Sequence, residues 1–173
     1  MRSAIFKQVF LPAIAMVFVG ALWTHAAQSL SAPEGSPILH VSGNIQNTNE
    51  QGVAVLDLAM LERIGVTRIQ TSTPWTEGRP VFEGVLMRDL LAELGAEGDS
   101  VVAVALNDYR VEIPTSDFTQ YPVILAYKMD GKRLRVRDKG PLWIIYPQDD
   151  YSELNTKQGH GRWAWQIKDL VIQ

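Results

Sequence analysis

The sequence predicts an α+β domain with a mixed, mostly antiparallel, partly curled sheet and two short helices. About eight or nine short segments rich in Val, Ile, Leu and aromatic residues are separated by Gly, Pro, Asn and Asp turn signals. Only two segments show the apolar spacing of an amphipathic helix. The segments also lack the regular strand–helix alternation of a doubly wound parallel fold, which leaves the α+β class.

The folded part is expected to begin with a strand and then a helix. Ile38–Ile45 alternates apolar and polar residues, which predicts the first strand. A polar turn follows. Within Val53–Gly65, apolar residues at spacings of three share one helical face, Asp57 is suited to the N-cap, and Gly65 is suited to end the helix.

The segment Arg68–Gly95 predicts a strand, an irregular loop and an amphipathic helix. Arg68–Thr71 alternates as a strand does, and the next residues include two prolines and a glycine that interrupt regular pairing. The four leucines from Leu86 to Leu94 fall on one helical face, and Gly95 follows as a stop signal. A loop between a strand and a helix is a common place for a binding pocket.

Two hairpins are predicted in the second half of the chain. Ser100–Leu106 is a continuous apolar strand, and Tyr109–Ile113 returns from an Asn-Asp turn with clear alternation. Val123–Met129 is again apolar, and an Asp-Gly turn joins it to a predicted partner strand at Lys132–Arg137.

The remaining segments are shorter or irregular. Pro114–Phe118 predicts a turn or a single helical turn, and Leu142–Tyr146 predicts a buried strand. Pro147–Gly161 is polar and predicts a long loop. Trp163–Ile172 alternates and predicts the closing strand.

The domain organisation predicted from composition has three parts. Residues 1–26 combine two basic residues, an apolar run shorter than the ~20 residues of a spanning helix, and small residues at a cleavage site, which predicts a signal peptide. Residues 27–37 are rich in Ser, Pro and Ala and predict a flexible leader, and 38–173 form a single domain. We therefore expect a periplasmic or secreted protein with no membrane span after cleavage; an uncleaved anchor is the alternative.

Composition excludes several classes of protein. The chain has 46% hydrophobic and 20% charged residues, as expected of a globular domain. Its net charge of −3 argues against nucleic-acid binding. Because it has no cysteine and only three histidines, neither disulfides nor a structural zinc site are expected.

Several segments resemble one family in their order along the chain. Gly84–Gly95 (GVLMRDLLAELG) is similar to the G-V-x-L-x-x-L-L-x-x-x-G segment of the molybdopterin-binding domain of sulfite-oxidase-type oxidoreductases. Asn107–Phe118, Ile124–Leu134 and Gly140–Pro147 follow in the family's order. The resemblance covers about Ile38–Ile172 and implies a sulfite-oxidase molybdopterin-domain-like fold.

The family resemblance also implies a metal ligand that this chain lacks. In the family, a cysteine thiolate just before the G-V-x-L segment binds molybdenum, whereas the corresponding residues here are Thr71, Ser72 and Thr73. A hydroxyl does not replace the soft thiolate donor. We therefore expect no bound cofactor, and molybdopterin with Ser72 or a neighbour as an oxygen ligand is the alternative.

A basic segment is the first candidate binding site. On the predicted strand, Arg133, Arg135 and Arg137 point to one face, and Lys139 follows. Guanidinium groups match phosphate and carboxylate oxygens, so this face is a candidate site for a small anion. The alternative is a solvated outer face or a charged edge strand that prevents aggregation.

The other candidate ligand-binding residues lie near the central loop and the first hairpin. They are Thr71, Ser72, Thr73, Trp75, Asp108 and Tyr109. Their hydroxyl, carboxylate and aromatic groups are suited to line a pocket, but each also has an ordinary structural role at a strand end, in the core or in a turn. No catalytic or metal-ligating residue is assigned.

Two functions remain open from the sequence. The first is a non-catalytic exported module, with a sensor or accessory role, that binds a small anionic ligand or a periplasmic or membrane protein partner. The second is a molybdopterin-dependent oxidoreductase that uses a non-cysteine metal ligand. A purely structural interaction protein is a third, simpler reading.

Overall fold

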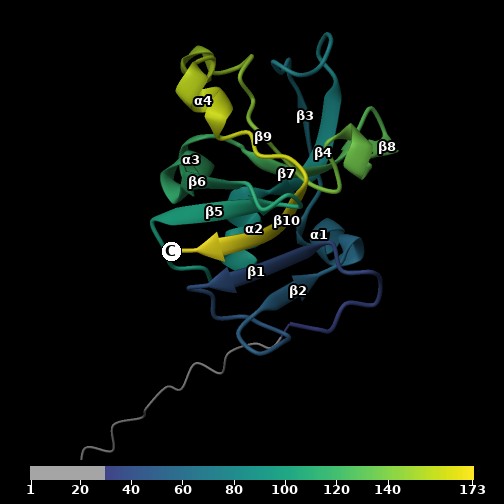
Figure 1. Ribbon diagram of the computed structural model, residues 1–173, viewed down its shortest axis with the longest axis vertical. Helices are drawn as coiled ribbons and strands as arrows, with labels where there is room; N and C mark the ends of the chain where they lie inside the picture. The colour runs from purple at the N-terminus through teal and green to yellow at the C-terminus, as the bar shows by residue number, and fades with distance from the viewer. Residues whose placement is uncertain (1–29) are drawn as a thin grey trace, which may run out of the picture.

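Two sheets form the framework of the protein (Figure 1). The computed structural model describes residues 30–173. The predicted signal peptide lies outside these residues. Within them, no helix is both long and apolar enough to cross a membrane.

The first sheet has the strand order β2-β1-β10-β5-β6. These strands are Ala54–Leu56, Leu39–Gly43, Ile167–Ile172, Ser100–Ala105 and Arg110–Pro114. β1 and β10 pair in parallel, and the other neighbours pair antiparallel. The last strand of the chain therefore lies in the middle of this sheet, between the first strand and the β5–β6 hairpin.

The second sheet has the order β3-β4-β7-β8, and β9 pairs with β7. Its strands are Thr67–Gln70, Val81–Leu86, Ile124–Met129, Lys132–Arg133 and Trp143–Ile145. All these pairs are antiparallel. The loop between β3 and β4 and the segment after β9 both lie at the upper end of the molecule in Figure 1.

Four short α-helices occur in the described residues. They are α1 (Leu58–Ile64), α2 (Met87–Glu93), α3 (Thr115–Gln120) and α4 (Lys157–Gly161). Asp57 caps α1 as expected, because its carboxylate accepts the Met60 N–H at 2.9 Å. It also accepts the Gly35 N–H at 2.6 Å, and this bond is the main reason that the pKa of Asp57 is lowered.

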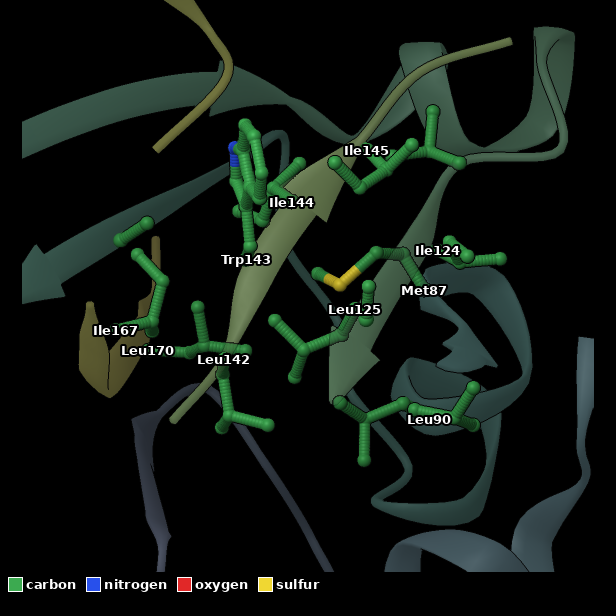
Figure 2. Packing of buried hydrophobic residues seen from close by; sticks show 14 of the residues in the cluster. Met87, Leu90, Ile124, Leu125, Leu142, Trp143, Ile144, Ile145, Ile167 and Leu170 are labelled. Atoms are coloured by element: carbon green, nitrogen blue, oxygen red, sulfur yellow. The ribbon is translucent and has the colours of Figure 1, made fainter. Parts of the chain in front are cut away.

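The core lies between the sheets and against α2. Figure 2 shows Met87 and Leu90 of α2 beside Ile124 and Leu125 of β7, with Trp143 to Ile145 of β9 and Ile167 and Leu170 of β10 on the other side. All of these side chains are fully buried. β7 and β9 are continuous apolar runs because side chains on both faces of these strands are buried.

The α+β class with mostly antiparallel pairing is confirmed, and three details differ from the expectation. The strands divide between two sheets instead of one curled sheet. β2 and β4 were not predicted. The segment predicted as a long loop contains α4 and the 3₁₀ turn Ser152–Leu154.

The predicted strand Lys132–Arg137 is wrong beyond Arg133. The chain leaves β8 there and forms a 3₁₀ turn, Val136–Asp138, followed by Lys139 at φ 68°. A left-handed residue ends an extended run. The expected flexible leader is bonded to the domain near both ends of residues 30–37. The Leu30 N–H donates to the Thr48 carbonyl oxygen, and the N–H of Ile38, the next residue after the leader, donates to the Leu56 carbonyl oxygen.

Candidate functional site

A polar cluster surrounds Ser72 at the end of β3. We call Thr71, Ser72, Arg79, Gln148 and Asp149 the Ser72 cluster. The Ser72 hydroxyl donates to Asp149 Oδ1 at 2.5 Å, and the Ser72 N–H donates to Asp149 Oδ2 at 2.8 Å. Arg79 Nε donates to the same Oδ2 at 2.6 Å. Ser72 and Asp149 are 77 residues apart, so the fold brings them together.

The amide of Gln148 completes the Ser72 cluster. Its Nε2 donates to the Ser72 carbonyl oxygen at 3.0 Å and to the Ser72 hydroxyl oxygen at 3.1 Å. The Thr71 hydroxyl accepts the Asp149 N–H at 3.3 Å. The Ser72 hydroxyl therefore has both a donor and an acceptor partner within the protein.

These contacts act on the charge of Asp149. The hydrogen bond from the Ser72 hydroxyl, together with those from the Ser72 N–H and Arg79, holds the pKa of the Asp149 carboxyl below its usual value. Burial opposes this shift. The carboxylate is therefore ionised at neutral pH, directly beside the hydroxyl that stands at the expected position of the metal ligand.

Thr73 orients the next part of the loop. Its hydroxyl accepts the Trp75 N–H at 3.1 Å and lies 2.8 Å from the Thr76 hydroxyl. Thr73 is 6% exposed, whereas Trp75 is 36% exposed. The loop thus buries a hydroxyl in its own backbone and turns an indole ring outward, as Asx- and ST-type turns do.

The indole ring of Trp75 forms part of the wall of a pocket that is lined by several aromatic side chains. We call this pocket, of about 370 Å³, the aromatic pocket. It is lined by Trp75, Ala105, Asn107, Tyr109, Val111, His160, Gly161, Trp163, Ala164, Trp165 and Gln166. The ring centroids of Trp75 and Trp165 are 5.0 Å apart, and those of Trp75 and Trp163 are 5.9 Å apart. Its volume is in the range of about 300–1,000 Å³ typical of small-molecule sites.

Three parts of the fold build the aromatic pocket. Trp75 comes from the β3–β4 loop, Tyr109 from the β5–β6 hairpin, and His160 to Gln166 from α4 and the chain entering β10. Tyr109 is 63% exposed, whereas Trp163 is 1% exposed. The pocket therefore has a rigid buried floor and an open aromatic rim.

His160 connects the aromatic pocket to the Ser72 cluster. Its Nε2 donates to Gln148 Oε1 at 2.9 Å, and its ring packs edge-on against Trp75 at 6.2 Å. Lys139 lies against two of the rings that pack on Trp75, those of Trp143 and Trp165. Its ammonium is 5.0 Å from the Trp165 ring and 5.6 Å from the Trp143 ring. Both distances are within the range of cation–π contacts.

The basic segment does not form the expected single face. Arg135 Nε pairs with Asp138 at 2.5 Å, and Arg137 is 4.0 Å from the same carboxylate. Lys132, Arg133 and Arg135 line a separate hollow together with Asp130 and Asp138. These carboxylates oppose an anion, which weakens this segment as an anion site.

The candidate residues from the sequence are thus divided among several places. Trp75 and Tyr109 share the aromatic pocket, with Lys139 beside it. Asp108 is turned away to pair with Lys168 at 2.7 Å. Ligand binding by any of these residues remains a prediction.

Sequence reasoning missed several members of the two sites. Gln148, Asp149 and His160 lie in the segment predicted as a solvated loop, and Arg79 carried no signal. Trp163 is buried and Trp165 is partly buried against the core, and both also line the aromatic pocket. The density of tryptophans near the C-terminus was the one available signal. Within residues 30–173, no group of three or more His, Cys, Asp or Glu side chains could hold a metal ion.

Comparison with known proteins identifies the family whose sequence pattern matches this chain. The oxidoreductase molybdopterin binding domain family matches residues 42–151, and this confirms the resemblance predicted from the sequence. No curated protein matches the chain. The fold is similar to the crystal structure of the sulfane dehydrogenase SoxCD from Paracoccus pantotrophus, with a TM-score of 0.58 and 19% identity. The match covers 78% of this chain and 37% of that chain, so this protein spans well under half of the SoxCD chain.

Proposed function

Because this chain belongs to the family of oxidoreductase molybdopterin binding domains, we propose that it keeps the family fold and has exchanged catalysis for binding. In this proposal it is a non-catalytic exported module, with a sensor or accessory role, that binds a small ligand or a partner protein. Export is proposed from the signal-peptide pattern in residues 1–26. The binding surface is the aromatic pocket.

The residues around Ser72 do not fit a metal held in the way the family resemblance implies. The chain has no cysteine, so no thiolate is available to a soft metal centre. The Ser72 oxygen is already shared between the Asp149 carboxylate and the Gln148 amide. A metal at that oxygen would crowd the Gln148 amide, which already occupies one of its two lone pairs, and the donor is an oxygen and not the soft thiolate of the family.

One observation carries the proposal: the Ser72 hydroxyl is bound within the protein on both sides. The hydroxyl donates a hydrogen bond to the Asp149 carboxylate, and its oxygen accepts one from the Gln148 amide. Arg79 holds Asp149 in place with a second charged hydrogen bond. Such a network stabilises the β3–β4 loop and uses the hydroxyl's one donor and one of its two acceptor lone pairs within the protein.

The experiment is a metal and pterin analysis of the full chain. The protein would be purified from a host that makes molybdenum cofactor, and molybdenum would be measured by mass spectrometry and pterin by fluorescence after oxidation. We expect both to stay at the level of an unrelated protein purified in parallel. Stoichiometric molybdenum and pterin would overturn the proposal.

The Ser72→Ala variant distinguishes the oxidoreductase alternative. If the Ser72 oxygen were a metal ligand, the wild type would carry molybdenum and the variant would lose it. If the proposal holds, both proteins are equally free of metal, and the variant differs only in stability.

A further inference from the structure

Two of the exposed large hydrophobic residues of the described chain lie at the aromatic pocket. The exposed large hydrophobic residues in residues 30–173 are Val66, Trp75, Leu106, Tyr109 and Val136. Trp75 and Tyr109 line the aromatic pocket itself. The backbones of Leu106 and Val136 are hydrogen-bonded to Gln166, which also lines it. The two exposed aromatic side chains that share one hollow, Trp75 and Tyr109, are typical of a binding site.

The charges around the aromatic pocket select the kind of ligand. No Asp or Glu lies among its lining residues. The Lys139 ammonium lies against the Trp165 ring, which forms one wall. A cationic ligand would need free aromatic ring faces, and Lys139 already covers a face of Trp165. The positive charge of Lys139 would also repel a positively charged ligand. An anion is favoured instead.

Polar groups also occur among the residues that line the aromatic pocket. The Trp163 indole N–H is buried and has no hydrogen-bond partner among the described residues. The side-chain amides of Asn107 and Gln166 line the same pocket. The Gln166 amide already donates to the Val136 carbonyl oxygen, so the Asn107 amide is the group that offers a donor to acceptor oxygens of an occupant.

From these observations we propose that the aromatic pocket binds a small planar aromatic molecule that carries an anionic group such as a carboxylate. The ring packs against Trp75, Tyr109 and Trp165, and the anionic group lies on the side of the positive charge of Lys139. This inference rests on the proposed binding function and names the class of ligand. The basic segment around Arg133 is not part of this site.

The test compares matched small probes on the full-chain protein by calorimetry. Indole-3-acetate carries the ring and the negative charge, tryptamine carries the ring and a positive charge, and cyclohexylacetate carries the charge without an aromatic ring. We expect indole-3-acetate to bind at least about tenfold more tightly than the other two. Equal or tighter binding of tryptamine would overturn the proposal, as would the absence of measurable indole-3-acetate binding.

Three variants tie the binding to the aromatic pocket. Tyr109→Ala and Trp75→Leu each remove ring contacts at exposed or half-exposed positions, and each is expected to weaken indole-3-acetate binding at least about fivefold. Lys139→Met is expected to reduce the preference for indole-3-acetate over tryptamine. Val66→Ala is the matched control, because Val66 is also exposed but lies outside the pocket, and its affinity should equal that of the wild type.

The outcomes separate this inference from the proposed function. If the protein is free of molybdenum and pterin but none of the probes binds, the ligand class is wrong and the non-catalytic proposal stands. If indole-3-acetate binds equally well to Tyr109→Ala, Trp75→Leu and wild type, the assigned pocket is wrong. If stoichiometric molybdenum and pterin are present, the proposed function itself fails.

Discussion

Ser72 and Trp75 are three residues apart, yet their surroundings are of opposite kinds. Around Ser72, the amide, carbonyl and hydroxyl groups all have protein partners. Around Trp75, aromatic rings pack edge to face but leave an open pocket of about 370 Å³. In the proposed function, Ser72 serves the fold, and the surface for a ligand is the aromatic pocket beside it.

The physical reason for this difference is how polar and apolar groups are satisfied. A hydrogen-bonding group that already has its partners gains little from a ligand. An exposed aromatic ring still gains from being covered, because water is released from its surface. His160 contacts both regions, through a hydrogen bond to Gln148 and an edge-on contact with Trp75.

The largest expected effect is on the floor of the aromatic pocket. Trp163 is 1% exposed and stacks on Tyr146. Trp163→Ala should lower the free energy of unfolding by about 3–5 kcal/mol, because it removes a large buried ring and leaves a cavity. Urea denaturation measures this change. Trp75→Ala should lower the free energy of unfolding by less, since 36% of Trp75 is already exposed. Equal losses of stability in the two variants would contradict the distinction between a buried floor and an exposed rim.

The second-largest effect on stability is expected at the buried carboxylate of Asp117. The buried Asp117 carboxylate accepts from the Tyr146 hydroxyl at 2.9 Å and from Arg162 at 2.6 Å. Asp117→Asn should lower the free energy of unfolding by about 1.5–3 kcal/mol, because charged hydrogen bonds are lost. Asp89→Asn is the control at an exposed carboxylate and should cost no more than about 0.5 kcal/mol. Similar losses in chemical denaturation would contradict the role of Asp117.

A smaller effect is expected in the Ser72 cluster. Ser72→Ala should cost about 1 kcal/mol at neutral pH, since it removes the hydroxyl bonds to Asp149 and Gln148. The variant would sharpen the comparison, because binding of aromatic probes should be nearly unchanged. Loss of probe binding without loss of stability would instead place Ser72 in the ligand site.

The pH dependence of that variant follows from the lowered pKa of Asp149. A carboxyl whose pKa is lower in the folded state stabilises the fold above its unfolded value, near 3.9, and this stabilisation is lost as the pH falls through the lowered value. Removing the Ser72 hydroxyl raises the folded pKa of Asp149 toward the unfolded value. The stability difference between wild type and Ser72→Ala should therefore be largest at neutral pH and shrink in acid. Thermal unfolding over this range measures it, and a constant difference would contradict it.

The smallest effect is expected at the basic segment. The Arg135 side chain is 61% exposed and pairs only with Asp138 among the described residues. Arg135→Gln should change the free energy of unfolding by no more than about 0.5 kcal/mol, because water and salt screen such pairs. It should also leave indole-3-acetate binding unchanged. A clear loss of that binding would move the anion site from the aromatic pocket to the basic segment.

Local signals were sufficient for the elements whose ends are marked in the sequence. The N-cap at Asp57, the stop at Gly95 and the Asp130-Gly131 turn are where the sequence predicted them, because capping and positive φ depend on neighbouring residues only. β2 and β4 were missed, since β2 has only three residues and the apolar run of β4 is interrupted by Glu83 and Gly84. Lys132–Arg137 alternates like a strand, but its partner β7 pairs with only the first two residues.

The sequence by itself determined the fold class, the family and the absence of a sulfur ligand, because composition, capping and segment order are properties of the chain. Only the tertiary structure decided what replaced that ligand and where a pocket opened. Asp149 reaches Ser72 across 77 residues, and the aromatic pocket joins residues from the β3–β4 loop, the β5–β6 hairpin and the chain entering β10. Contacts between segments so distant in sequence exist only once the two sheets have packed, so no local pattern encodes them.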